Sequence, residues 1–367
     1  MSGEERVRSL VELAVESELD QLIVGDLVRP GDTGRDAGAD LFWLTGFGGT
    51  SGLGLVGPDE RLFITDFRYA ERAEREVSGG FERQVATAQL VPALAERLAG
   101  RVGYDETKTS VRSLQRLEEL APDGIELVAA AGLVERLRRR KDALEVTAIA
   151  EAARLADEVF EWLLARGVTG RAEREVALAA SQRMRELGAA DPSFPPIVAS
   201  GPGSALPHHE PGEREVRSGE LLLIDMGAIV DGYCSDCTRT FAVGEVDDEQ
   251  RDVYELVRRA QEDALAAAVA GRSARAADAA ARDPIALAGH GERFGHGLGH
   301  GVGIEVHEAP RISQRSDDTL AQGDVVTIEP GVYLPGRYGV RIEDLVVIGE
   351  IELRNMSSVS KELQVVG

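Results

Sequence analysis

The stretch 221–243, LLLIDMGAIVDGYCSDCTRTFAV, decides the fold because it contains two apolar runs separated by Asp231-Gly232. This dipeptide is favoured at the centre of tight two-residue hairpin turns. We therefore predict two antiparallel strands in which Asp225 pairs with Thr238.

The predicted hairpin brings two carboxylates together. Because side chains alternate between the two faces of a strand, Asp236 shares a face with Thr238 and therefore with Asp225. A carboxylate inside an apolar strand is costly to bury without compensation, and a cation is the obvious compensating group. The alternative is a solvent-facing pair on an exposed hairpin.

The stretch 325–348, VVTIEPGVYLPGRYGVRIEDLVVI, has the same organisation. Glu329 and Glu343 each follow an isoleucine inside an apolar run, and a Pro-Gly-Arg turn lies between them. They lie on one face if the connecting loop has an odd number of residues, for example when Leu334 pairs with Tyr338. A bulge restores the register if the loop is even.

Between these two hairpins lies the segment 294–308, FGHGLGHGVGIEVHE, whose alternating glycines permit close backbone approach and unusual dihedral angles. We expect this loop to wrap a site, with His300 as its single nitrogen ligand. The histidines all fall in the second half of the chain, and the structural interpretation is preferred for His209 and His290. The histidines are His208, His209, His290, His296, His300 and His307.

Two Asp, two Glu and one neutral His would supply four negative charges, enough to balance two divalent cations. Oxygen ligands with one imidazole favour Mn²⁺, Co²⁺ or Fe²⁺ over the sulfur and nitrogen chemistry of structural zinc. Two such ions, roughly 3.5–4 Å apart, would bridge a hydroxide and polarise a carbonyl. The pattern therefore predicts a di-metal hydrolase.

The composition sets wider bounds. A chain of 367 residues with 43% apolar residues can bury a large core and is long enough for two domains. Its formal charge of -23 disfavours nucleic acid and acidic membrane surfaces as partners. We expect no secretory leader and no membrane span, and with two cysteines and no disulfide framework we expect the cytoplasm.

The chain divides into two parts. Short apolar runs such as Gln21–Val28 alternate with helical stretches in residues 1–132, which indicates a smaller α/β domain. Apolar positions recur at helical spacing from about Leu133 to Arg166, where Gly167 ends the pattern. We place the domain boundary at the start of this helix, so that residues 133–367 form the catalytic domain.

The motifs IDMGA, SDCTRT, GHGVG, IEPG and RIED resemble those of the metallopeptidases of the pita-bread fold, close to Xaa-Pro dipeptidases (prolidases) and Xaa-Pro aminopeptidases. The resemblance covers nearly the whole chain and implies a mixed α/β fold. Its expected parts are a pita-bread catalytic domain and a creatinase-like amino-terminal domain. It implies that Asp236 and Glu343 bridge two metal ions and that Glu329 also accepts a proton. The implied ligands are Asp225, Asp236, His300, Glu329 and Glu343.

The resemblance also implies roles for residues around the metals. The family's histidine near the substrate corresponds to His208, the one beside the leaving-group pocket to His296, and the one that hydrogen-bonds the scissile carbonyl or its oxyanion to His307. Arg311 occupies a position proposed to hold a dipeptide's free carboxylate, which a planar two-pronged cation does well. The alternative for Arg311 is a surface salt bridge.

These expectations together predict metal-dependent hydrolysis of short peptides with proline after the scissile bond, with Mn²⁺ as the first choice of metal and Co²⁺, Fe²⁺ or Zn²⁺ as alternatives. The family's amino-terminal domain commonly completes a neighbour's active site, so a homodimer is expected. Three alternatives remain: an aminopeptidase acting on longer Xaa-Pro peptides, an enzyme acting on an amidine such as creatine, and a non-catalytic peptide-binding homologue. Cys234 shares the face of Asp236, which makes thiol reagents candidate inhibitors.

Overall fold

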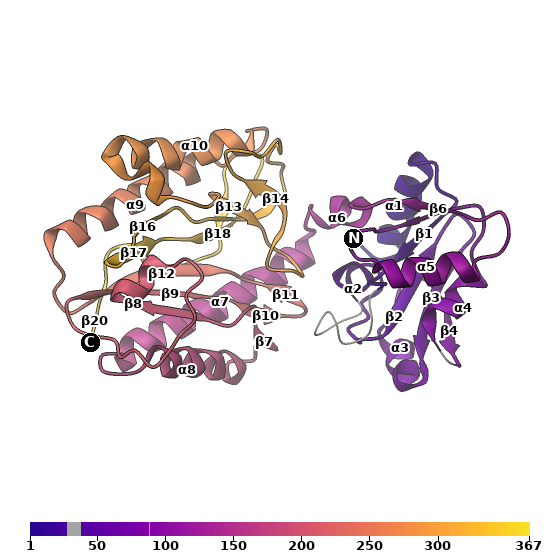
Figure 1. Ribbon diagram of the computed structural model, residues 1–367, viewed down its shortest axis with the longest axis horizontal. Coiled ribbons are helices and arrows are strands. Elements are labelled where there is room, and N and C mark those ends of the chain that lie inside the picture. The colour runs from indigo at the N-terminus through magenta and orange to yellow at the C-terminus, as the bar shows by residue number, and fades with distance from the viewer. Residues whose placement is uncertain (28–37, 88) are drawn as a thin grey trace. The chain divides into compact units, whose positions relative to one another are not determined.

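The computed structural model describes residues 1–27, 38–87 and 89–367, which form two compact units, Met1–Arg138 and Arg139–Gly367 (Figure 1). Helix α6 (Leu133–Arg138) packs against two helices of the first unit, α1 (Gly3–Glu16) and α2 (Ala39–Thr45). The expected boundary between residues 132 and 133 therefore lies before α6, whereas the first unit ends after it.

The first unit is built on one mixed sheet with strand order β4-β3-β2-β1-β5-β6. Pairs β1·β2 and β2·β3 are antiparallel, and β1·β5, β3·β4 and β5·β6 are parallel. Val28, in the predicted first strand, lies outside the described residues. The strands are β1 (Gln21–Val24), β2 (Gly52–Val56), β3 (Arg61–Asp66), β4 (Glu82–Ala86), β5 (Arg101–Tyr104) and β6 (Glu126–Ala129). The remaining helices are α3 (Ala70–Glu76), α4 (Leu90–Ala95) and α5 (Val111–Leu120).

The second unit begins with a break in the long helix predicted over 133–166. That prediction of one continuous helix is wrong, because α6 ends at Arg138 and α7 (Ala143–Arg166) begins anew. The cause is a capping box: Asp142 accepts hydrogen bonds from Leu144 N and Glu145 N, and the Glu145 side chain accepts one from Asp142 N. The predicted end at Gly167 is confirmed.

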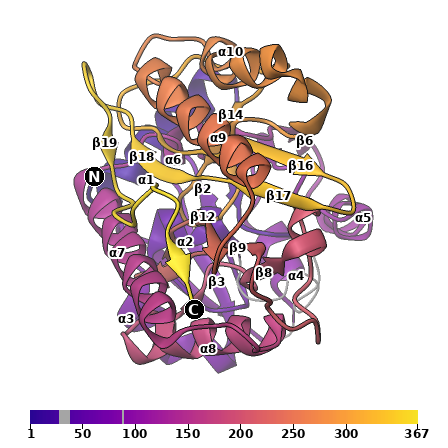
Figure 2. The same cartoon turned by 90° about the vertical axis from the view of Figure 1, so that its left-hand side faces the viewer.

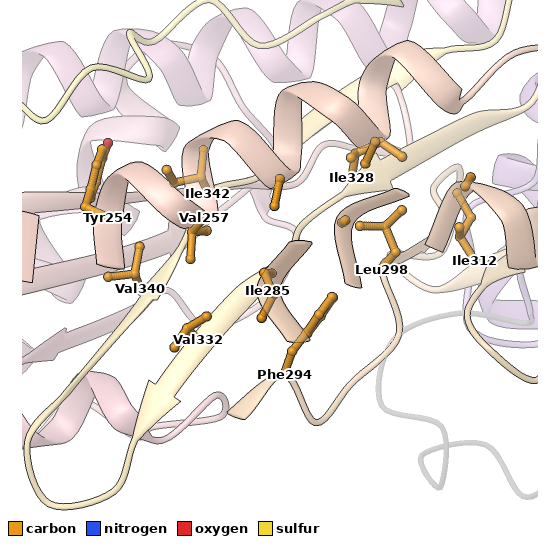
Figure 3. Packing of buried hydrophobic residues seen from close by; sticks show 14 of the residues in the cluster. Tyr254, Val257, Ile285, Phe294, Leu298, Ile312, Ile328, Val332, Val340 and Ile342 are labelled. Carbon is orange, nitrogen blue, oxygen red and sulfur yellow. The ribbon is translucent and has the colours of Figure 1, made fainter. Parts of the chain in front are cut away.

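Two helical layers enclose the strands of the second unit. Helices α9 (Asp248–Ala267) and α10 (Ala274–Ile285) cover one side, and α7 and α8 (Glu173–Glu186) cover the other (Figures 1 and 2). Each layer has its own buried apolar cluster. In the α9–α10 cluster, Tyr254 and Val257 lie with Val340 and Ile342 on one side, and Ile285 lies near Phe294 (Figure 3).

The strands between these layers form several small sheets, as expected for the predicted mixed fold. A sheet of order β20-β12-β9-β8 contains the first predicted hairpin, and a sheet of order β14-β13-β15-β18-β19 contains the ends of the second. The strands are β7 (Asp191–Pro192), β8 (Ile197–Ser200), β9 (Glu220–Met226), β10 (Ala228–Val230), β11 (Tyr233–Cys234), β12 (Cys237–Val243), β13 (Gly299–Gly301), β14 (Glu308–Ile312), β15 (Val325–Ile328), β16 (Gly331–Leu334), β17 (Tyr338–Arg341), β18 (Asp344–Val347), β19 (Arg354–Asn355) and β20 (Val365–Val366). Within the described part of the chain, no helix has the length and apolar character needed to cross a membrane.

Candidate metal centre

The first hairpin has the predicted register. Asp225 of β9 pairs with Thr238 of β12, and the turn residues Asp231 and Gly232 both have positive φ, 49° and 81°. Strand β9 stops before Gly227, where an added Cβ would lie 1.8 Å from the carbonyl oxygen of Ser235. At this close approach the hairpin is divided between two sheets, with β9 and β12 paired in one and β10 and β11 paired in the other. The Asp225–Thr238 pairing is kept.

The second hairpin also has the predicted register. Leu334 pairs with Tyr338 across the turn, and Ile328 pairs with Asp344 at the other end. Glu329 and Glu343 lie between these pairs at opposing positions, so the odd loop length alone places both carboxylates on one face.

His300 reaches the carboxylates from β13. Its Nδ1 lies 3.0 Å from the carbonyl oxygen of Gly301, and because a carbonyl can only accept, Nδ1 carries the proton. The other ring nitrogen, Nε2, lies 3.3 Å from Oε1 of Glu329 and 3.7 Å from Oδ2 of Asp236. Close backbone approach makes this placement achievable, since a Cβ on Gly299 would lie 2.0 Å from the carbonyl oxygen of Thr327.

The structure brings the five predicted ligands into one buried cluster. One ligand atom each from Asp236, His300 and Glu343 lies within 4.8 Å of the others, and Glu329 contacts His300. Oδ1 of Asp225 is buried without a hydrogen-bond partner among the described residues, as expected of an oxygen placed for a cation. This oxygen-rich donor set with one imidazole fits divalent metal ions.

Burial and mutual repulsion oppose ionisation in this cluster. Burial raises the pKa of Asp225, and burial followed by repulsion from neighbouring carboxylates raises the pKa values of Asp236 and Glu343 well above the usual range. Burial also acts to raise the pKa of Glu329, but the hydrogen bond and charge of His300 bring it to about 2. A cation between these groups would remove the repulsion.

Two residues that support the carboxylates were missed by the sequence reasoning. Thr238 Oγ1 donates to Oε2 of Glu343 at 2.7 Å and accepts from Nε of Arg341 at 3.0 Å. The buried Arg341 also donates through Nη2 to Oδ2 of Asp225 at 2.5 Å. Strand alternation would have found Arg341, since it lies two residues before Glu343 on the same face.

A pocket adjoins the cluster and contains two of the predicted histidines. Its volume is about 620 Å³, and its walls include His208, His296, Tyr333, Arg293 and Glu292. His208 is exposed at this pocket, whereas His296 is partly buried.

A hydrogen-bond chain joins the pocket to the cluster. Nδ1 of His296 lies 2.8 Å from the carbonyl oxygen of Gly297 and so carries the proton. Nε2 then accepts from the Tyr333 hydroxyl at 2.9 Å, and that oxygen accepts from Arg341 at 3.0 Å. Burial lowers the pKa of His296, which keeps its imidazole neutral.

The remaining predicted residues lie beside His300. The rings of His307 and His300 have centroids 4.4 Å apart. Desolvation, followed by repulsion from His300 and Arg311, lowers the pKa of His307 to about 4, although the side chain keeps solvent contact. Arg311 is the strand partner of His300 and is exposed.

His209 and the two cysteines each make a hydrogen bond with another protein group. His209 bonds the buried Glu173 at 2.8 Å, so the structural interpretation of this histidine is confirmed. Both cysteines are free: Sγ of Cys234 donates to the carbonyl oxygen of Ile304, and Sγ of Cys237 donates to that of Glu343.

Comparison with known proteins gives matches over both units. Residues 147–350 match the model of metallopeptidase family M24, and residues 6–140 match that of the creatinase/prolidase N-terminal domain. The uncharacterized peptidase YqhT of Bacillus subtilis is 41% identical over 88% of this chain and 92% of its own length. The Xaa-Pro dipeptidase of Pyrococcus furiosus is 33% identical over 98% of this chain and 99% of its own. A solved structure, the Xaa-Pro dipeptidase from Bacillus anthracis, superposes with a TM-score of 0.92 at 35% identity and covers 99% of this chain and 100% of its own.

Proposed function

The chain belongs to metallopeptidase family M24 and is a metal-dependent hydrolase, and on this premise we propose that it cleaves the Xaa-Pro bond of short peptides in the manner of a prolidase. The observation that carries the proposal is the buried carboxylate–imidazole cluster beside an open pocket with histidines in its wall. Relatives described as Xaa-Pro dipeptidases support the choice of substrate.

In this proposal two divalent ions would be held by Asp225, Asp236, His300, Glu329 and Glu343. When bound, the ions supply an activated water nucleophile and polarise the scissile carbonyl. Mn²⁺ is the proposed metal, with Co²⁺, Fe²⁺ and Zn²⁺ as the alternatives to be tested.

Two protein groups near the metals supply the proton acceptor and the hydrogen-bond donor of the reaction. Glu329, whose Oε1 lies 3.3 Å from Nε2 of His300, accepts the proton released by the nucleophile. His307, neutral because its pKa is about 4, donates a hydrogen bond to the carbonyl oxygen as negative charge develops there.

The pocket receives the residue after the scissile bond. His208 and His296 stand in its wall with Tyr333, and Pro207 and Pro335 add apolar surface suited to a proline ring. Arg311 lies on the strand paired with that of His300 and binds the free carboxylate of a dipeptide. We also propose a homodimer and a cytoplasmic location, the latter supported by two free cysteines.

The test is reconstitution of the chelated protein with Mn²⁺, Co²⁺, Fe²⁺ or Zn²⁺, followed by assays on Xaa-Pro dipeptides, Xaa-Pro-Xaa tripeptides and matched peptides with alanine in place of proline. The proposal expects cleavage of the dipeptides, with proline strongly preferred over alanine. Preference for the tripeptides would instead identify an aminopeptidase. Absence of cleavage from every metal-loaded form, despite bound metal, would favour a peptide-binding homologue.

A further inference from the structure

The loop that carries His296 has few side chains that could fix its conformation. Residues 295, 297 and 299 are glycines, and glycine is the residue with the greatest conformational freedom to lose. Phe294 and Leu298 anchor the loop in the apolar cluster on either side of His296 (Figure 3). Between these anchors, the backbone needs polar partners from another element.

An ion pair on α10 provides these partners. Asp278 and Arg282 lie one helical turn apart, and the guanidinium binds both carboxylate oxygens, Nε to Oδ2 at 2.7 Å and Nη2 to Oδ1 at 2.8 Å. Both side chains are largely withdrawn from solvent, with 1% of Asp278 and 11% of Arg282 exposed.

The same pair binds the loop backbone at three positions. Arg282 donates through Nη1 to the carbonyl oxygen of Phe294 and through Nη2 to that of His296, each at 2.7 Å. Asp278 Oδ1 accepts from the backbone N–H of Leu298 at 3.1 Å. The guanidinium carbon also lies 3.9 Å from the centre of the Phe294 ring. The contacts thus fall on the residue that bears the imidazole and on the two anchors beside it.

We propose that Asp278 and Arg282 are positioning residues that fix the His296 imidazole in the pocket and thereby set how tightly the substrate binds. The Arg282 guanidinium makes four hydrogen bonds at once, two to the Asp278 carboxylate and two to carbonyl oxygens. The lysine ammonium has only three N–H donors and no planar fork for a carboxylate, so lysine cannot reproduce these contacts. The proposal rests on the proposed function for its effect on KM, while the orientation of His296 can be measured without any substrate.

The decisive variant is Arg282→Lys, which keeps the charge and loses the fork of donors. For a Xaa-Pro dipeptide, KM should rise about tenfold, the order expected when one charge-assisted hydrogen bond is lost, with a much smaller change in kcat. In a His296→Ala background, Arg282→Lys should raise KM no further. Arg275→Lys is the matched control on the same helix, since Arg275 is exposed and pairs with the surface Asp317.

A substrate-free measurement separates this proposal from the proposed function. In the intact protein both ring nitrogens of His296 are hydrogen-bonded, so diethyl pyrocarbonate should modify His296 slowly, as read by peptide mass mapping. Arg282→Lys and Asp278→Asn should accelerate this modification several-fold, while His208 and the affinity for Mn²⁺ stay unchanged.

Two results would overturn the positioning role. One is an unchanged His296 reactivity in both variants. The other is that kcat falls in these variants in proportion to their loss of thermal stability while KM stays constant, which is the result expected of an ion pair with only a structural role. Failure of the wild-type protein to cleave any Xaa-Pro peptide would reject the proposed function and leave the His296 reactivity test standing.

Discussion

Removal of the metal ions should destabilise the second unit, and by more at high pH than at low pH. A ligand present at one hundred times its dissociation constant stabilises the folded state by about 2.7 kcal/mol, so two such sites contribute about 5 kcal/mol. A unit of this size shifts by about 2–4 °C per kcal/mol. Metal loading at pH 8 should therefore raise its melting temperature by about 10–20 °C.

The pH dependence follows from the carboxyl groups of the metal-free cluster. The folded-state pKa values of Asp225, Asp236 and Glu343 are raised, so their protonated forms stabilise the fold below the unfolded carboxyl pKa of about 4. That contribution is lost as the pH rises through the raised values. The lowered pKa of Glu329 acts in the opposite direction, but only below about pH 4. Above pH 5 the metal-free protein should become less stable, while metal binding strengthens as its ligands lose protons.

Differential scanning calorimetry of chelated and Mn²⁺-loaded protein at pH 5.5 and pH 8 measures both effects. Glu343→Gln is the informative variant, because it removes one charge and leaves an oxygen to accept from Thr238. Its metal-free form should melt above metal-free wild type at pH 8, and its gain from Mn²⁺ should fall by at least about half as one of two sites is lost. Glu350→Gln, at an exposed position, is the control. The reasoning fails if the metal increment is equal at both pH values, or if Glu343→Gln keeps the full increment.

Two further predictions concern other buried groups of the second unit. Lys141 and Glu308 form a buried ion pair at 2.8 Å with side chains 1% and 7% exposed. Lys141→Met should therefore lower the free energy of unfolding in urea by about 3–5 kcal/mol, and the double variant Lys141→Met with Glu308→Leu should recover most of this loss. Equal losses of stability in both variants would contradict this account. Burial raises the pKa of Cys234 to about 12, so iodoacetamide at pH 8 should label neither Cys234 nor Cys237 in the folded protein, while labelling both in urea. This reverses the expectation from the sequence that thiol reagents inhibit through Cys234, and rapid native labelling of Cys234 would restore it.

The parts of the site that the sequence predicted are those set by local rules. The register of Glu329 against Glu343 depends on whether one short turn has an odd or an even number of residues, and that turn lies between Leu334 and Tyr338. The break before α7 is also encoded locally, by Asp142 and Glu145, but helical periodicity on both sides concealed it. Arg341 was not predicted as part of the site because a basic residue next to a turn is usually exposed. Its spacing of two residues from Glu343 nevertheless places both side chains on the same face of the strand.

Residues that act through tertiary packing could not be found in this way. Asp278 and Arg282 belong to a helix whose pattern predicts only its apolar side, and nothing near them in the sequence points to the backbone of His296. The pocket is similar, because Tyr333 and His296 meet only after the second hairpin folds against the glycine-rich loop. Such contacts join segments far apart in the chain, so their partners are fixed by packing rather than by spacing.

Arg341 changes the charge balance that first suggested two metal ions. Four carboxylates and one buried guanidinium leave the ionised cluster with a formal charge of −3. One divalent cation would still leave a buried negative charge, which the raised pKa values of Asp236 and Glu343 show to be unfavourable. Two divalent cations leave a single positive charge instead. A buried positive charge attracts an anion, and one hydroxide would neutralise it. Two ions thus favour the nucleophile of the proposed reaction, whereas a single ion would repel it.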